Sequence, residues 1–302
     1  MEKIPIIAVV GPTASGKTAL AVELAKAYDA EVVSFDSMQL YKGMDIATAK
    51  PTTEEMQGIP HHMISCVDPS VSYSVAMFKD DATAIIDDII SRGKHVVMVG
   101  GTGLYIDTLM QNITFLSGDF SAASAELSNL TLDEMNEKLL SIDPEYAAVV
   151  DTSNAKRVRR ALEIYFATGK TMTEQLELSK AEPSRYAPIY IGLNARDRDF
   201  LYSRIDKRVD VMLENGLVSE ARSFMSMGPT AKQAIGIKEL MPYLSGGASL
   251  ETCVSKIKQG TRNYAKRQLT WFRKNPDIHW LYIDEMPMDA IVSEARRIID
   301  EC

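Results

Sequence analysis

One stretch of eight residues limits the possible folds of this chain more than any other: residues 11–18 are Gly-Pro-Thr-Ala-Ser-Gly-Lys-Thr. They match the phosphate-binding pattern G-x-x-x-x-G-K-[ST]. A continuous apolar run over residues 4–10 precedes them, which is typical of a buried parallel strand. Residues 17–28 follow in a helical pattern that places Leu20 and Leu24 on one face. Because a phosphate-binding loop (P-loop) requires this strand–loop–helix context, we expect a diphosphate site here.

The P-loop is expected to bind a diphosphate through its backbone and two of its side chains. Its glycines let backbone N–H groups face the phosphates, and the helix N-terminus that follows favours negative charge. Lys17 is expected to contact terminal phosphate oxygens, and the Thr18 hydroxyl to hold a Mg²⁺ ion. The predicted diphosphate- or nucleotide-binding residues are Gly11, Pro12, Thr13, Ala14, Ser15, Gly16, Lys17 and Thr18.

Strand and helix patterns alternate along the first third of the chain. Residues 31–35 and 95–99 have the pattern of buried strands, and residues 75–92 that of a helix between them. Residues 189–193 return to strand character. This alternation predicts an α/β fold, a P-loop NTPase-like parallel sheet flanked by helices.

A change of character near residue 116 predicts a second domain. Residues 117–130 are rich in Ser and Ala without strong periodicity and are expected to form a loop. A capping box that begins at Thr131 opens a helix to Ile142, and a further helix is expected over 154–168. We therefore predict a helical insertion that contacts RNA at 116–186. The P-loop core would consist of 1–115 and 187–302, with a mainly helical stretch over 198–275.

Polar residues follow the second and third predicted strands. Asp36 stands where the second strand ends, the edge of an α/β sheet at which ligands bind. From the sequence alone it could be a magnesium ligand, a general base or a helix N-cap. The third strand leads into Gly-Gly-Thr, where Thr102 could donate to a phosphate or a substrate base, or belong to a plain turn. No second acid suited to Mg²⁺ follows, which argues against ordinary kinase or hydrolase chemistry.

Basic residues gather in two places although the net charge is −8. Residues 256–274 contain seven basic residues and no acid, and 156–160 form a second basic cluster. Within an acidic protein such clusters indicate phosphate contacts, although a solvated helix face is an equal alternative for a charge run. We expect Tyr264 and Trp271, which lie among these charges, to be core residues.

The chain lacks the sequence signs of membrane insertion or secretion. No apolar run approaches the roughly 20 residues needed to span a bilayer. The apolar run near the N-terminus is too short and wrongly flanked for a signal peptide. We therefore expect a cytoplasmic location, and a monomer by default.

Several stretches together resemble the tRNA dimethylallyltransferase (tRNA isopentenyltransferase) family. They are GPTASGKT (11–18), DSMQLYKGMDIATAKP (36–51), HH (61–62), GGTGLY (100–105), RVRRALE (157–163), DRDFLYSRIDKRVDVML (197–213), QAIGIKE (233–239) and TRNYAKRQLTWFR (261–273). They occur in order over almost the whole chain. The resemblance implies transfer of a dimethylallyl group from dimethylallyl diphosphate to the exocyclic amine of the adenine 3′-adjacent to the tRNA anticodon, with Mg²⁺ as cofactor.

The resemblance also implies roles for individual residues. Asp36 would be the catalytic base, assisted by Thr13 and Lys17 at the diphosphate. The tRNA would contact Asp36, Ser37, Met38, Gln39, Thr102, Lys156, Arg157, Val158, Arg159 and Arg160. The alternatives are an adenylate isopentenyltransferase, which uses a free nucleotide, and a P-loop kinase of a small metabolite. The basic stretch at 256–274 and the helical insertion favour RNA as the acceptor.

Overall fold

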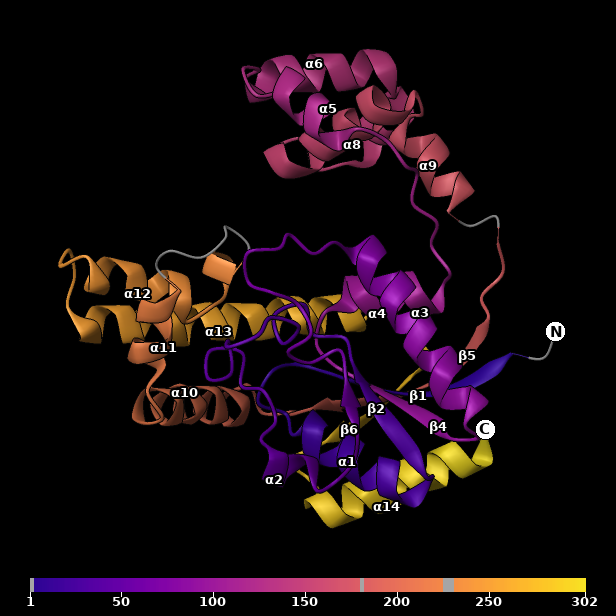
Figure 1. Ribbon diagram of the computed structural model, residues 1–302, viewed down its shortest axis with the longest axis vertical. Helices are drawn as coiled ribbons and strands as arrows, with labels where there is room; N and C mark the ends of the chain where they lie inside the picture. Colours follow the sequence, from indigo (N-terminus) through magenta and orange to yellow (C-terminus); the bar gives the residue numbers. More distant parts are fainter. Residues whose placement is uncertain (1–2, 180–181, 225–230) are drawn as a thin grey trace. The chain divides into compact units, whose positions relative to one another are not determined.

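The computed structural model describes residues 3–179, 182–224 and 231–302. The chain divides into two compact units. The core unit consists of Met1–Leu109 and Tyr186–Cys302, and the helical unit of Met110–Arg185 (Figure 1). The sequence placed the boundaries of the insertion at 116 and 186. Within the described residues, no helix is both long enough and apolar enough to span a bilayer.

The core unit contains a six-stranded sheet in the order β3-β2-β4-β1-β5-β6, and every pair of neighbouring strands is parallel. The strands are β1 (Ile4–Val10), β2 (Ala30–Ser34), β3 (His61–His62), β4 (His95–Val99), β5 (Tyr186–Asn194) and β6 (Ile278–Tyr282). This confirms the predicted parallel α/β sheet. In the short strand β3, His62 Nε2 lies 2.7 Å from Glu31 Oε2, a structural contact.

Helices cover both faces of this sheet (Figure 1). They are α1 (Lys17–Ala27), α2 (Thr53–Met56), α3 (Val75–Ser91), α4 (Gly103–Met110) and α14 (Met288–Glu301). On one face, Leu20 and Leu24 of α1 pack with Val9 and Val97 of the sheet and Ile291 of α14. The apolar faces of the helices therefore pack against the continuous apolar strands in one core. This packing fixes the position of the sheet edge formed by the carboxyl ends of the strands.

The C-terminal part of the core unit is mainly helical, as predicted. It contains α10 (Arg198–Glu214), α11 (Leu217–Ser223), the short 3₁₀ turn Ala231–Gln233, α12 (Ile237–Leu244) and α13 (Leu250–Phe272). A second core forms between these helices and the loop after β2, where Tyr41 and Met44 pack with Val209, Leu217 and Ile257. The loop after Asp36 is thereby attached to α10, α11 and α13.

The helical unit has a small core of its own. Its helices are α5 (Phe120–Glu126), α6 (Leu132–Ile142), α7 (Pro144–Val149), α8 (Ala155–Thr168) and α9 (Met172–Leu178). The buried residues include Leu127, Leu139 and Leu162. The prediction of a loop over 117–130 is wrong, because the Asp119 carboxylate accepts the N–H groups of Ser121 and Ala122 and starts α5.

Candidate active site

The P-loop runs from the carboxyl end of β1 to the first residue of α1, as predicted. Gly11 has a φ of 139°, and a Cβ at this position would lie 2.3 Å from the carbonyl oxygen of Leu193 in β5. No other residue fits there without moving the neighbouring strand. The Ser15 hydroxyl donates to the Pro12 carbonyl at 2.9 Å, which closes the turn. Packing and local hydrogen bonds therefore give the loop its shape.

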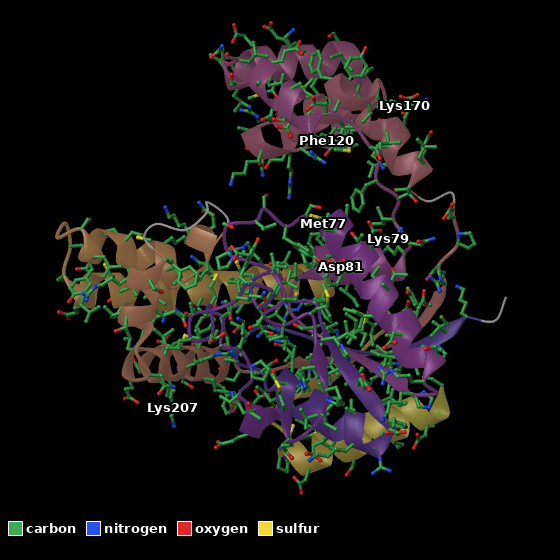
Figure 2. All side chains as sticks on the ribbon, in the orientation of Figure 1. Met77, Lys79, Asp81, Phe120, Lys170 and Lys207 are labelled. Atoms are coloured by element: carbon green, nitrogen blue, oxygen red, sulfur yellow. The ribbon has the colours of Figure 1, made fainter. Side chains whose placement is uncertain are left out.

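Two arginines of α10 reach the P-loop. Arg204 Nε donates to the Ala14 carbonyl oxygen at 2.9 Å. Arg208 Nη1 donates to Thr13 Oγ1 at 3.4 Å, and its Nη2 donates to the Ala49 carbonyl at 3.3 Å. The neighbouring Lys207 is exposed and extends away from the helix (Figure 2). Helix α10 thus brings two cations to a loop whose sequence already predicts an anionic ligand.

Gln268 of α13 joins the P-loop to the turn between β4 and α4. Its Oε1 accepts the backbone N–H of Thr13 at 2.9 Å, and its Nε2 donates to the Gly101 carbonyl at 3.1 Å. The side chain is buried. Since a buried amide with both ends bonded is rigid, Gln268 fixes the distance between the two glycine turns.

Asp36 and Thr102 lie at the same edge of the sheet as the P-loop. Their strands, β2 and β4, are adjacent and parallel, and β4 also pairs with β1. The backbone N–H of Ser37 donates to Thr102 Oγ1 at 3.1 Å, which connects the ends of β2 and β4. Asp36 Oδ1 accepts the N–H of Met38 at 2.9 Å, so the carboxylate is held in a fixed turn. The sequence-predicted residues of the core unit therefore come together.

The charges of this site act on one another. Burial, followed by the positive charge of Arg208, lowers the pKa of Lys17 to about 7, while the carboxylate of Asp36 opposes the shift. Burial also lowers the pKa of the Arg208 guanidinium, which Asp36 again opposes. In this structure Lys17 Nζ donates to the Pro12 carbonyl at 2.6 Å. A diphosphate would favour the protonated lysine, because its negative charges raise the pKa of a nearby amine.

Two aromatic residues of α13 depart from the prediction that they are core. Tyr264 is half-buried beside the site, where burial and then the negative charge of Asp36 raise the pKa of its hydroxyl. The Arg267 guanidinium lies 5.7 Å from the centre of its ring. Trp271 is 40% exposed, and its Nε1 donates to Asp107 Oδ2 at 2.8 Å. The helical pattern places both on an apolar side of the helix. It does not show whether neighbouring elements extend far enough to cover these side chains.

Gln39, a predicted RNA contact, is engaged within its own loop. Its Oε1 accepts the Ser34 hydroxyl at 3.2 Å. Its Nε2 donates to the carbonyls of Thr48 and Ala49 at 3.3 and 3.4 Å. An RNA contact from this side chain would compete with these bonds, and its role in this structure is to shape the loop.

The predicted basic cluster at 156–160 belongs to α8 of the helical unit. Lys156 and Arg157 are exposed. Arg160 stacks its guanidinium 4.4 Å over the ring of Phe120, which Figure 2 labels. Arg159 Nη2 donates to the Ser124 carbonyl at 2.6 Å. The prediction fails for the side chain of Val158, which is 0% exposed in the core of this unit and is not available to RNA.

The basic residues of 256–274, which lie in α13 and directly after it, fall into two groups. Lys258 forms an ion pair with Asp210 and Arg262 with Asp206, each at 2.6 Å, so their charges are balanced by α10. The remaining ones are exposed: Lys256, Lys266, Arg267, Arg273 and Lys274. Part of the predicted basic surface therefore serves packing between helices, and part faces solvent.

Thr18 is compatible with the predicted Mg²⁺ ion. It lies half-buried in the first turn of α1, directly after Lys17. Within the described ranges, no group of three or more His, Cys, Asp or Glu residues could hold a metal. Because Mg²⁺ keeps several waters and is commonly bound through substrate phosphates, a single hydroxyl beside a diphosphate site fits its preferences.

Three polar residues of this site were not predicted from the sequence: Arg204, Arg208 and Gln268. Gln268 bonds to a residue 255 positions away in the sequence, and Arg208 to one 195 positions away. No local motif predicts such pairs. The available signal was weak: each lies in a stretch that resembles the family, among residues of helical periodicity.

Comparisons with known proteins agree on one family. The family model of the IPP transferases matches residues 39–275. The chain is similar to the tRNA dimethylallyltransferase of Thermoanaerobacter sp., with 47% identity over 293 residues that cover 93% of each chain. It is 44% identical over 307 residues to that of Halalkalibacterium halodurans, covering 98% of this chain and 97% of the relative.

Solved structures give the same result. A crystal structure of a tRNA Δ2-isopentenylpyrophosphate transferase from Staphylococcus epidermidis matches with a TM-score of 0.73 and 42% identity, covering 99% of each chain. A eukaryotic dimethylallyltransferase acting on tRNA matches with a TM-score of 0.83 and 30% identity, covering 99% of this chain and 80% of the other. By sequence and by structure, this chain belongs to the tRNA dimethylallyltransferase (IPP transferase) family.

Proposed function

We propose that the protein transfers a dimethylallyl group from dimethylallyl diphosphate to the exocyclic amine of the adenine 3′-adjacent to the tRNA anticodon, and releases diphosphate. The proposal rests on one observation: Asp36, Thr102 and the P-loop lie at the same edge of the sheet. This arrangement offers one carboxylate for a proton and several cations for a leaving diphosphate. Membership of the family supports the same reaction.

The diphosphate binds where the positive groups converge. The backbone of the P-loop, Thr13 and Lys17 hold its oxygens, and Arg204 and Arg208 lie beside them. When bound through Thr18, Mg²⁺ would add to the neutralisation of the leaving group's charge. Because this charge develops as the carbon–oxygen bond breaks, preorganised cations stabilise the transition state more than the bound substrate.

Asp36 takes the proton of the attacking amine. As the amine nitrogen forms its bond to the first carbon of the prenyl chain, the bond from that carbon to the diphosphate oxygen breaks. The proton of the amine passes to the Asp36 carboxylate, whose turn is fixed by the bond from Met38. Thr102, whose hydroxyl oxygen accepts the Ser37 N–H, would hold the adenine at this edge.

The tRNA binds through basic side chains of both units. Phosphate contacts come from Lys156, Arg157 and Arg160 of α8 and from the exposed basic residues of 256–274. The target adenine must leave its stack to reach Asp36, which costs less in an anticodon loop than in a duplex. We propose that the protein acts as a monomer in the cytoplasm, where its tRNA substrate is found.

The two alternative activities receive less support. A free-nucleotide acceptor would give the exposed Lys156 and Arg157 of α8 no phosphate backbone to bind. A small-metabolite kinase would need a second acid after Asp36. The relatives named above are transferases that act on tRNA. Neither alternative is favoured.

A transfer assay with labelled dimethylallyl diphosphate tests the proposal. Unmodified tRNA and AMP are offered in parallel, with Asp36→Ala as the inactive control. We expect label on the tRNA and its loss in the variant. Label on AMP would indicate an adenylate isopentenyltransferase, which uses a free nucleotide. Label on neither acceptor would reject prenyl transfer.

A further inference from the structure

Glu220 of α11 holds a loop that has no regular secondary structure. Its carboxylate accepts three consecutive backbone N–H groups, those of Asp45 at 2.9 Å and of Ile46 and Ala47 at 2.8 Å each. A carboxylate can accept this many bonds, and charge-assisted bonds are about twice as strong as neutral ones. One side chain, more than 170 positions away in the sequence, therefore fixes residues 45–47.

The loop in turn presents a carbonyl group to the active site. Ala49 has a φ of 45°, a left-handed conformation that is uncommon for residues other than glycine. Its carbonyl oxygen accepts a bond from Arg208 Nη2 at 3.3 Å and one from Gln39 Nε2 at 3.4 Å. Lys50 Nζ donates to Asp45 Oδ1 at 2.8 Å and ties the two ends of the loop together. The strained residue keeps its conformation only while its surroundings hold it.

Arg208 links this loop to the P-loop. Its other terminal nitrogen donates to Thr13 Oγ1 at 3.4 Å. A long arginine side chain loses conformational freedom when it binds an anion, and an acceptor that fixes it beforehand reduces that loss. The position of the Ala49 carbonyl therefore affects how well the guanidinium is preorganised for a diphosphate.

We propose that Glu220 is a positioning residue of the diphosphate site. By holding residues 45–47 it keeps the Ala49 carbonyl where that group fixes the Arg208 guanidinium beside Thr13. Glu220 itself does not touch the substrate. The inference rests on the proposed function in one respect, that the P-loop binds a diphosphate.

Calorimetric titration with inorganic pyrophosphate in the presence of Mg²⁺ tests this role without turnover. The proteins are the wild type, Glu220→Ala, Arg208→Ala and the double variant. We expect Glu220→Ala to bind pyrophosphate about tenfold more weakly than the wild type. In the Arg208→Ala background the same change should alter the affinity less than about twofold, because the two residues act through one contact.

Two further variants make the result specific. Glu220→Gln keeps one acceptor oxygen and should lose less affinity than Glu220→Ala; if the alanine variant does not fold, the cycle is run with glutamine. Glu134→Ala removes a carboxylate that accepts a backbone N–H at 2.8 Å in the helical unit, and should leave pyrophosphate binding unchanged.

Three results would overturn the inference. Wild-type affinity in Glu220→Ala would show that the loop does not depend on this residue. Equal losses in both backgrounds would show that Glu220 acts on folding in general rather than through Arg208. Absence of pyrophosphate binding by the wild type would overturn the proposed function and the inference with it.

Discussion

The core unit and the helical unit hold their arginines in different ways. In the core unit, Arg204 and Arg208 donate to groups of the P-loop and of the loop that ends at Ala49. In α8 of the helical unit, Arg157 is exposed and Arg160 lies over the ring of Phe120. Fixed cations suit a leaving group whose charge develops at one place, whereas exposed cations suit a phosphate backbone that is contacted at many. This difference fits the proposal that the core unit carries out the chemistry and that α8 of the helical unit contributes phosphate contacts to the tRNA.

The largest effect is expected from Asp36→Asn, which removes the proposed base while keeping an acceptor for the Met38 N–H. We expect kcat to fall about 100- to 10,000-fold, the usual contribution of a general base. The KM values for both substrates should change little. Steady-state assays with tRNA measure this, and Asp29→Asn, in an exposed ion pair with Lys94, serves as the control. A variant with near-normal kcat would show that the proton goes elsewhere.

A smaller effect is expected from Lys17→Ala, which removes one cation of the diphosphate site. We expect kcat/KM for dimethylallyl diphosphate to fall about 100-fold or more, since the lost contact strengthens in the transition state. Lys26→Ala, on the exposed side of the same helix, should keep normal kinetics. If both variants lost activity equally, the charge of α1 as a whole would matter more than the P-loop lysine.

Removal of the exposed charges of α8 should act on RNA binding alone. The triple variant Lys156→Ala, Arg157→Ala, Arg160→Ala should bind tRNA more weakly and with a shallower salt dependence. The slope of log K against log salt should fall by about 2 if three phosphate contacts are lost. Lys170→Ala removes a charge from the same unit, as Figure 2 shows, and should leave the slope unchanged. An unchanged slope in the triple variant would reject RNA binding by this cluster.

The smallest effect is expected in the number of protons that the protein takes up when it binds the diphosphate. The pKa of Lys17 lies at about 7 in the free protein, and a bound diphosphate would raise it. At pH 8 the free lysine is mostly neutral, so binding should take up nearly one proton; at pH 6 it is mostly protonated, and the uptake should be small.

Calorimetry in buffers of different ionisation enthalpy measures this uptake. Lys17→Arg is the matched control, because arginine stays protonated at both pH values. The difference between wild type and variant should appear at pH 8 and almost vanish at pH 6. No difference between wild type and variant at either pH would mean that Lys17 is already charged in the free protein.

How much the sequence could predict also differs between the two units. Strands β1 and β4 coincide with the predicted ranges 4–10 and 95–99, because buried parallel strands are continuous apolar runs. The P-loop was predicted because its backbone path demands particular residues, as the close approach of Gly11 to Leu193 shows. Local demands of this kind leave a motif in the sequence.

Contacts between distant segments leave no such motif. Gln268 and Arg208 reach the P-loop from α13 and α10, and nothing within those helices marks them. In the helical unit, the family resemblance implied RNA contacts for every residue of 156–160, and it could not separate exposed Arg157 from buried Val158. Helix α5 was missed because its signal is a single N-cap, Asp119, in a stretch of small residues.

The most direct test of separate roles for the two units measures the affinity of both kinds of variant for both ligands. Pyrophosphate and an anticodon stem–loop RNA are titrated into Lys17→Ala and into the triple variant of α8. We predict that Lys17→Ala loses affinity for pyrophosphate and keeps the RNA, while the triple variant loses the RNA and keeps pyrophosphate. Loss of pyrophosphate binding in the triple variant, or intact RNA binding, would contradict the account.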